Sequence, residues 1–96
     1  MSFLGRFRRR NREDPEVARR SLLLRTGRLG EATVLDTGVD SEGKDILSYC
    51  YTVAGVDYET VQRLDDDQLS RKNHYLPGSR VDLRYDPRRP VNSVVV

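Results

Sequence analysis

Residues 46–64 read ILSYCYTVAGVDYETVQRL, and this stretch decides the fold. Apolar and polar side chains alternate along both of its halves, which is the period of a β-strand with one buried face. The dipeptide Ala54-Gly55 between the two halves suits the tight turn of a hairpin. The sequence therefore predicts an antiparallel hairpin with strands over residues 46–53 and 56–64.

The turn also sets the pairing register of this hairpin. If Val53 pairs with Val56, then Tyr51 lies opposite Tyr58 and the two faces separate by polarity. The apolar face carries Leu47, Tyr49, Tyr51, Val53, Val56, Tyr58 and Leu64, and the polar face carries Ser48, Cys50, Thr52, Asp57, Glu59 and Arg63. We expect the tyrosine face to be core. The alternative is that Tyr49, Tyr51 and Tyr58 form an exposed platform that stacks on nucleic-acid bases.

Another strand is predicted before the hairpin. Residues 31–37 alternate with a period of two, with apolar side chains in both phases, so burial on part of both faces is expected. Residues 36–44 are rich in Gly, Asp and Ser and are expected to form a connecting loop.

Two more strands are predicted after the hairpin. Residues 64–74 are expected to be a loop or one short capped helix. A Pro77-Gly78 turn then leads into a strand over 80–85, and a rigid turn at 87–90 leads into a strand over 91–96. The expected fold class is mainly β, a small antiparallel barrel or sandwich of about five strands preceded by one N-terminal α-helix.

That helix is expected to begin after Asp14 and to end at Gly27. Asp14 can accept hydrogen bonds from the first turn, and Pro15 fits the first helical position. The helix should pack its apolar side on the sheet, while its arginines face outward or lie near its C-terminal end. The apolar side comprises Val17, Ser21 and Leu24 with Leu22 and Leu23, and the arginines are Arg19, Arg20 and Arg25.

Charge divides the chain into two parts. Residues 1–28 hold nine arginines and three acidic residues, whereas residues 29–96 hold eight basic and twelve acidic residues. Such a division indicates a basic docking segment on a mildly acidic body. We expect residues 1–12 to be a disordered basic arm and residues 13–96 to be a single β-rich domain that includes the helix.

The basic arm combines arginines with apolar residues at helical spacing, a pattern that suits a short interfacial helix on an anionic membrane. A solvated terminus that merely keeps the chain in solution is the blander interpretation. The candidate partner-binding residues are Phe3, Leu4, Arg6, Phe7, Arg8, Arg9, Arg10 and Arg12.

Cysteine content and hydropathy suggest a compartment. Cys50 is the only cysteine, so no disulfide can form within the chain, and a reducing cytoplasm fits best. No apolar run approaches the roughly 18–20 residues that span a bilayer. We expect a cytoplasmic protein, with the arm as a candidate peripheral anchor on the inner face of the membrane.

Few residues suggest chemistry. His74 is the only histidine, and Cys50 lies opposite the acidic Glu59, which does not favour a thiolate. The triplet Asp65-Asp66-Asp67 can attract a divalent cation but lacks the ligand spacing of an EF-hand, so a helix cap is expected instead. No enzyme activity, cofactor or metal is expected. A metal-dependent hydrolase built on Asp65–Asp67 and His74 is the weakest alternative.

Three segments in order resemble the bacterial domain-of-unknown-function 3592 family over about residues 29–96. They are Glu31-Ala32-Thr33-Val34-Leu35, the hairpin centre from Tyr49 to Tyr58, and Tyr75-Leu76-Pro77-Gly78 followed by Val81, Leu83, Tyr85-Asp86-Pro87 and Pro90. The resemblance implies a small β-rich module, often found beside transmembrane or membrane-associated segments, with no established activity. It implies no catalytic or binding residues. The chain departs from the commoner arrangement because it has no transmembrane helix.

The leading hypothesis is a non-catalytic interaction module that docks on a membrane surface or a protein partner through residues 3–12. Its body would present the hairpin edge or the 65–74 segment to that partner. The alternative is a small nucleic-acid-binding β-barrel that uses the arm arginines on phosphates. The sequence does not specify an oligomeric state.

Overall fold

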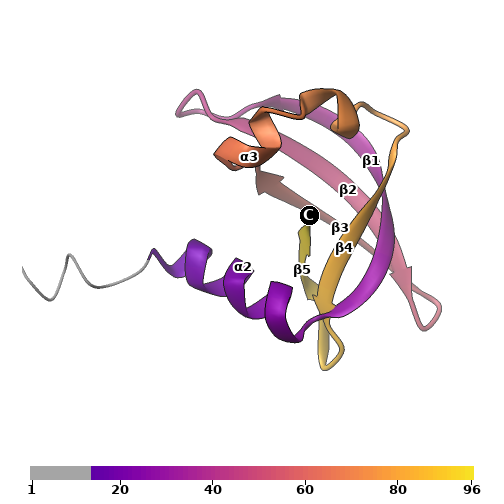
Figure 1. Cartoon of the computed structure of the whole chain (residues 1–96). Helices are drawn as coiled ribbons and strands as arrows, with labels where there is room; N and C mark the ends of the chain where they lie inside the picture. Colours follow the sequence, from indigo (N-terminus) through magenta and orange to yellow (C-terminus); the bar gives the residue numbers. More distant parts are fainter. Residues whose placement is uncertain (1–13) are drawn as a thin grey trace, which may run out of the picture.

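The computed structural model describes residues 14–96 as a helix followed by a curled antiparallel sheet (Figure 1). The elements are α2 (Pro15–Thr26), β1 (Arg28–Val39), β2 (Asp45–Val53), β3 (Val56–Arg63), α3 (Asp66–Leu69), the 3-10 helix η1 (Lys72–Tyr75), β4 (Arg80–Asp86) and β5 (Arg89–Val95). The strand order is β3-β2-β1-β4-β5, and the sheet curls into a nearly closed barrel. The predicted mainly β class with one preceding helix is confirmed. The predicted disordered arm, residues 1–12, lies outside the described residues.

The β2–β3 hairpin has the predicted register. Val53 pairs with Val56 and Tyr51 pairs with Tyr58. Ala54 and Gly55 both have positive φ angles, of 52° and 80°. Two positive φ angles in a two-residue loop are those of a type I′ turn, whose twist matches that of the strands it joins. The local sequence therefore specified both the turn and the register.

β1 is longer than predicted at both ends. It begins at Arg28 rather than at residue 31 and continues to Val39, so residues 36–39, expected in a loop, belong to the strand. The reason is its central position: its first half pairs with β4 and its second half with β2. Burial on both faces was also wrong, because Ala32 and Val34 are buried whereas Leu35, at a shift in the β1–β2 register, is exposed.

The core fills the concave face of the curled sheet. Tyr49 stacks on Tyr51 with 5.8 Å between ring centroids, and Tyr51 stacks on Tyr58 at 5.5 Å. The prediction that this tyrosine face forms the core is confirmed, although Val56 next to the turn is exposed. The buried cluster comprises Ala32, Val34, Leu47, Tyr49, Tyr51, Tyr75, Val81, Leu83, Tyr85 and Val95.

The predicted turns and caps outside the hairpin are also present. Gly78 has a φ angle of 89°, and the Ser79 N–H donates to Leu76 O at 2.9 Å, as in a type II turn with Pro77 in its first central position. Asp65 caps α3 and accepts from the Gln68 N–H at 2.8 Å. The Asp86 side chain accepts from the Arg88 N–H in the turn between β4 and β5. This turn is shorter than the predicted 87–90, because β5 begins at Arg89, which pairs with Asp86.

α2 begins and ends as predicted but faces the barrel with a different side. Asp14 caps it by accepting from the Glu16 N–H at 2.7 Å. Of the expected apolar stripe only Leu23 is buried, whereas Val17, Leu22 and Leu24 are about half exposed. The prediction that the whole stripe packs on the sheet was therefore wrong. The reason lies in the strand edge that α2 covers.

Candidate functional site

The sheet order leaves β3 and β5 as edge strands that face each other across a gap, which we call the seam. Gln62 of β3 crosses this seam to the backbone of Val95 in β5. The Val95 N–H donates to Gln62 Oε1 at 2.8 Å, and Gln62 Nε2 donates to Val95 O at 3.1 Å. The Gln62 residue is only 5% exposed. One side-chain amide thus makes the pair of hydrogen bonds that a neighbouring strand would otherwise supply.

Further side chains form hydrogen bonds with β5. Gln68 Nε2 from α3 donates to Val95 O at 2.8 Å. The Tyr49 hydroxyl is 2.8 Å from Ser93 Oγ, and the Tyr51 hydroxyl donates to Pro90 O. Every buried side-chain nitrogen and oxygen within residues 14–96 has a hydrogen-bond partner. Side chains therefore close the barrel where backbone pairing stops.

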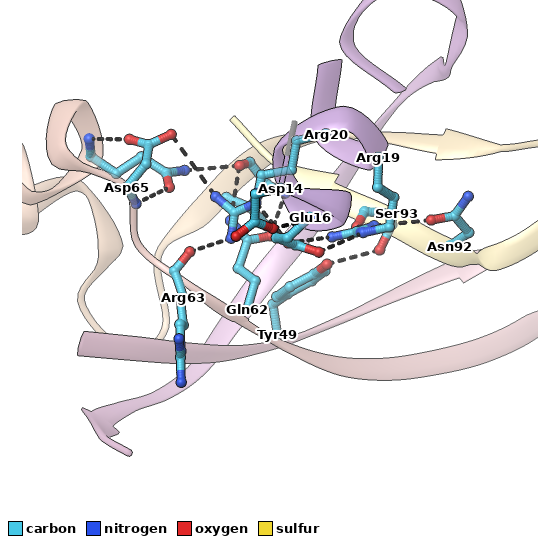
Figure 2. Close-up of polar contacts among 12 residues, drawn as sticks. Asp14, Glu16, Arg19, Arg20, Tyr49, Gln62, Arg63, Asp65, Asn92 and Ser93 are labelled. Carbon is cyan, nitrogen blue, oxygen red and sulfur yellow. Dashed lines mark hydrogen bonds and ion pairs between the residues drawn. The ribbon is translucent and has the colours of Figure 1, made fainter. Parts of the chain in front are cut away.

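α2 lies across the seam through two arginines (Figure 2). Arg19 Nη1 donates to Asn92 Oδ1 at 2.9 Å and to Ser93 O at 2.8 Å, both on β5. Arg20 donates to Arg63 O at the end of β3. The expectation that Arg19 and Arg20 face outward was therefore wrong. Free strand carbonyls need donors, which arginine supplies and leucine cannot.

Glu16 holds both of these arginines in place. Its carboxylate accepts from Arg19 Nε at 2.9 Å and Nη2 at 2.8 Å, and from Arg20 Nε at 2.8 Å. The hydrogen bond from Arg19 is the largest cause that lowers the pKa of Glu16 from 4.5 to about 2. The same hydrogen bond raises the pKa of Arg19. Glu16 and Arg19 are therefore charged at neutral pH. We call Glu16, Arg19 and Arg20 the clasp.

The clasp determines which residues α2 leaves in solvent. Glu16, Arg19, Arg20 and Leu23 recur at helical spacing and face the barrel. Val17 and Leu24 lie on the flank next to Arg20, and together with Leu64 they line a groove of about 550 Å³. Apolar side chains that the sequence assigned to the core are thus accessible along this flank of α2.

The tyrosine platform expected for a nucleic-acid-binding barrel is not present at the surface. Tyr49 is 1% and Tyr51 is 5% exposed, so neither ring can stack on a base. Tyr58 is half-buried and packs against the core. Burial raises the pKa of the Tyr49 and Tyr51 phenols, as expected for rings inside a barrel.

Two of the candidate metal ligands have structural roles. Asp65 caps α3, and Asp67 pairs with Arg71 at 2.9 Å. In the part of the chain that the structure describes, His, Cys, Asp and Glu form no group of three or more that could hold a metal ion. Cys50 lies opposite Glu59, as the hairpin register predicted. The described residues thus lend no support to the hydrolase alternative.

The predicted docking residues all lie outside the described residues. They are Phe3, Leu4, Arg6, Phe7, Arg8, Arg9, Arg10 and Arg12, and each stays a prediction. Sequence reasoning missed the clasp and Gln62. A usable signal was the spacing of Glu16 to Arg19 and Arg20, three and four residues apart on one helix side. Within residues 14–96 no helix is long and apolar enough to cross a membrane.

Comparison with known protein families gives a match over most of the chain. The sequence model of a family described as "Domain of unknown function (DUF3592)" matches residues 26–96. This range begins at the last residue of α2 and contains all five strands. No curated protein and no solved structure matches the chain.

Proposed function

The chain belongs to the family of domains of unknown function DUF3592, and on that premise we propose that it is a non-catalytic interaction module whose arginine-rich N-terminus docks on an anionic membrane surface. The family match covers residues 26–96 and so accounts for the barrel. The arm and nearly all of α2 precede that range. These N-terminal residues are the part of the chain to which we assign the docking.

One observation carries the proposal: α2 is bound to the barrel by two arginines and the buried Leu23, and it leaves Leu22 and Leu24 in solvent. Leu22 is 52% and Leu24 is 49% exposed, and Arg25 and Arg28 are exposed near them. Exposed leucines among arginines are typical of segments that lie in the interface of an anionic bilayer. Phe3, Leu4 and Phe7 extend the same composition into the arm.

Charge also supports an orientation for such docking. Each arginine near an anionic leaflet contributes about 1 kcal/mol, so the five arginines of residues 6–12 provide roughly 5 kcal/mol at most. The body from residue 29 onward has four more acidic than basic residues, and an anionic surface repels it. Attraction at one end and repulsion at the other would hold the barrel away from the lipid.

The same arginines would also attract an acidic protein or a nucleic acid, the two competing hypotheses. The buried tyrosines weaken the nucleic-acid hypothesis, because stacking contributes about 1–3 kcal/mol per base where aromatic rings are exposed. Without stacking on these rings, binding to nucleic acid would rely on phosphate contacts alone. Lipid binding needs no such platform.

The test compares the full chain with a 13–96 truncation. Binding to vesicles rich in phosphatidylserine and to single-stranded DNA is measured across a range of salt. The proposal predicts that the full chain binds the vesicles, that salt weakens the binding, and that the truncation loses it. Equal vesicle binding by both proteins would rule out the arm as the anchor. Stronger binding of the full chain to DNA than to vesicles would favour the nucleic-acid alternative.

A further inference from the structure

A groove of about 550 Å³ lies along one flank of α2. Val17 and Leu24 are seven residues apart, so they lie on the same side of α2 two turns from each other. Leu64, which follows β3, lines the groove with them. Three acidic and two basic side chains also line it, so charged groups accompany an apolar wall: Asp14, Glu16, Asp65, Arg20 and Arg63. Both half-exposed α2 residues would lose contact with water if an apolar segment bound here.

The chain itself supplies such a segment at the groove. Asp14 lines the groove, and thirteen residues precede it in the sequence. An extended chain spans about 3.3–3.6 Å per residue, so Phe7 can reach any point within about 25 Å of Asp14. The longest dimension of the described residues, by comparison, is 51 Å. A segment tethered this closely has an effective concentration at the groove on the order of millimolar. A separate partner would need a free concentration of that order to compete with it at equal affinity.

The chemistry of that segment complements the groove. Phe3, Leu4 and Phe7 provide apolar side chains for a wall of Val17, Leu24 and Leu64. Arg6 and Arg8 flank Phe7 in the sequence, and the groove carries three carboxylates against two arginines, Arg20 and Arg63. Asp65 is the carboxylate best placed to pair with an arginine of the arm, because its side chain is 56% exposed and its distance to Arg20 is 3.9 Å. Apolar and ionic contacts thus favour the same occupant.

We propose that in the free protein residues 3–8 occupy this groove, with Phe7 against Val17 and Leu24. This inference concerns the chain in the absence of lipid, and it stands whether or not the arm binds a membrane. If the arm also binds lipid, the groove and the bilayer compete for the same aromatic side chains. The groove would then lower the apparent affinity for lipid by the fraction of chains in which the arm is seated.

The test is nuclear magnetic resonance of the full chain without lipid. Phe3 and Phe7 are the only phenylalanines, so magnetisation transferred from phenylalanine rings to methyl groups reports on the arm alone. The inference predicts transfer to the methyl groups of Val17 and Leu24. The methyl groups of Val61, which is similarly exposed on β3 and does not line the groove, are the matched control. Transfer to Val61 alone, or to no methyl group, would overturn the inference.

Two further measurements distinguish binding of the arm in the groove of its own chain from binding elsewhere or to a second copy. Replacing Phe7→Ser should shift the methyl resonances of Val17 and Leu24 and leave those of Val61 in place. In an equimolar mixture of phenylalanine-labelled and methyl-labelled chains, transfer between the two populations should be absent. Transfer in that mixture, at about half of the strength seen when every chain carries both labels, would mean that the arm of a second copy fills the groove, which would overturn the intramolecular assignment.

Discussion

Replacing Gln62→Met tests the closure of the barrel at a single side chain. Methionine keeps the length and nearly the volume of glutamine but cannot hydrogen-bond to Val95. Val95 O would keep its bond from Gln68 Nε2 at 2.8 Å, whereas the Val95 N–H would lose its partner, Gln62 Oε1. A buried donor left without a partner costs about 1–3 kcal/mol. We therefore expect the free energy of unfolding to fall by about 2 kcal/mol.

The assay is urea unfolding followed by circular dichroism, together with a thermal scan. For a domain of this size each kcal/mol lowers Tm by about 4–8 °C, so the Gln62→Met variant should melt roughly 8–16 °C below the parent. The matched control is Val61→Thr, a neighbouring exposed position on β3, where the change should stay within about 0.5 kcal/mol. A Gln62→Met variant as stable as this control would refute the account of the seam.

Three more predictions follow from the helix and the turns. Glu16→Gln should lower the free energy of unfolding by about 0.5–1 kcal/mol at pH 7, since the Glu16–Arg19 pair is half exposed. Because the folded-state pKa of Glu16 is lowered to about 2, its contribution to stability is present above the unfolded pKa of 4.5 and is lost as the pH falls through about 2. The stabilities of parent and variant, measured by acid titration, should therefore converge at that pH. Equal pH dependence of the two proteins would contradict the clasp. Gly27→Ala should destabilise by about 1–3 kcal/mol in urea, because a Cβ would lie 2.5 Å from Leu23 O, and an unchanged midpoint would show that the end of α2 can shift freely. Ala54→Gly should stabilise the hairpin by about 0.5–1 kcal/mol by relieving a positive φ angle, and a lower Tm would argue against the type I′ turn.

Local sequence patterns were sufficient where neighbouring residues determine the structure. The hairpin register, the Asp14 cap and the Pro77-Gly78 turn each depend on a few consecutive residues, and each was predicted. The length of β1 was not predictable in the same way, because its ends are set by pairing with β2 and β4.

The buried side of α2 was mispredicted for a related reason. Leucines at helical spacing indicate a core-facing stripe, and that rule assumes an apolar surface to cover. The surface under α2 is instead a strand edge with free carbonyls, which arises only when the barrel closes. Arg19 satisfies Ser93 O and Arg20 satisfies Arg63 O, so these two arginines are directed inward. Leu22 and Leu24 face outward, and only Leu23 is buried. The role of Gln62 was not predicted because its amide has a hydrogen-bond partner only once the barrel closes and β5 lies opposite β3.

The docking proposal is tested most directly by charge removal within the full-length chain. Arg6, Arg8, Arg9, Arg10 and Arg12 are replaced together by glutamine, and binding to phosphatidylserine-rich vesicles is compared with that of the parent. A control carries Arg80→Gln and Arg88→Gln, two exposed arginines of the body. The account predicts that the arm variant loses binding while the control keeps it, with each single arm substitution costing about 1 kcal/mol, or about fivefold in affinity. Undiminished binding by the arm variant would contradict the account.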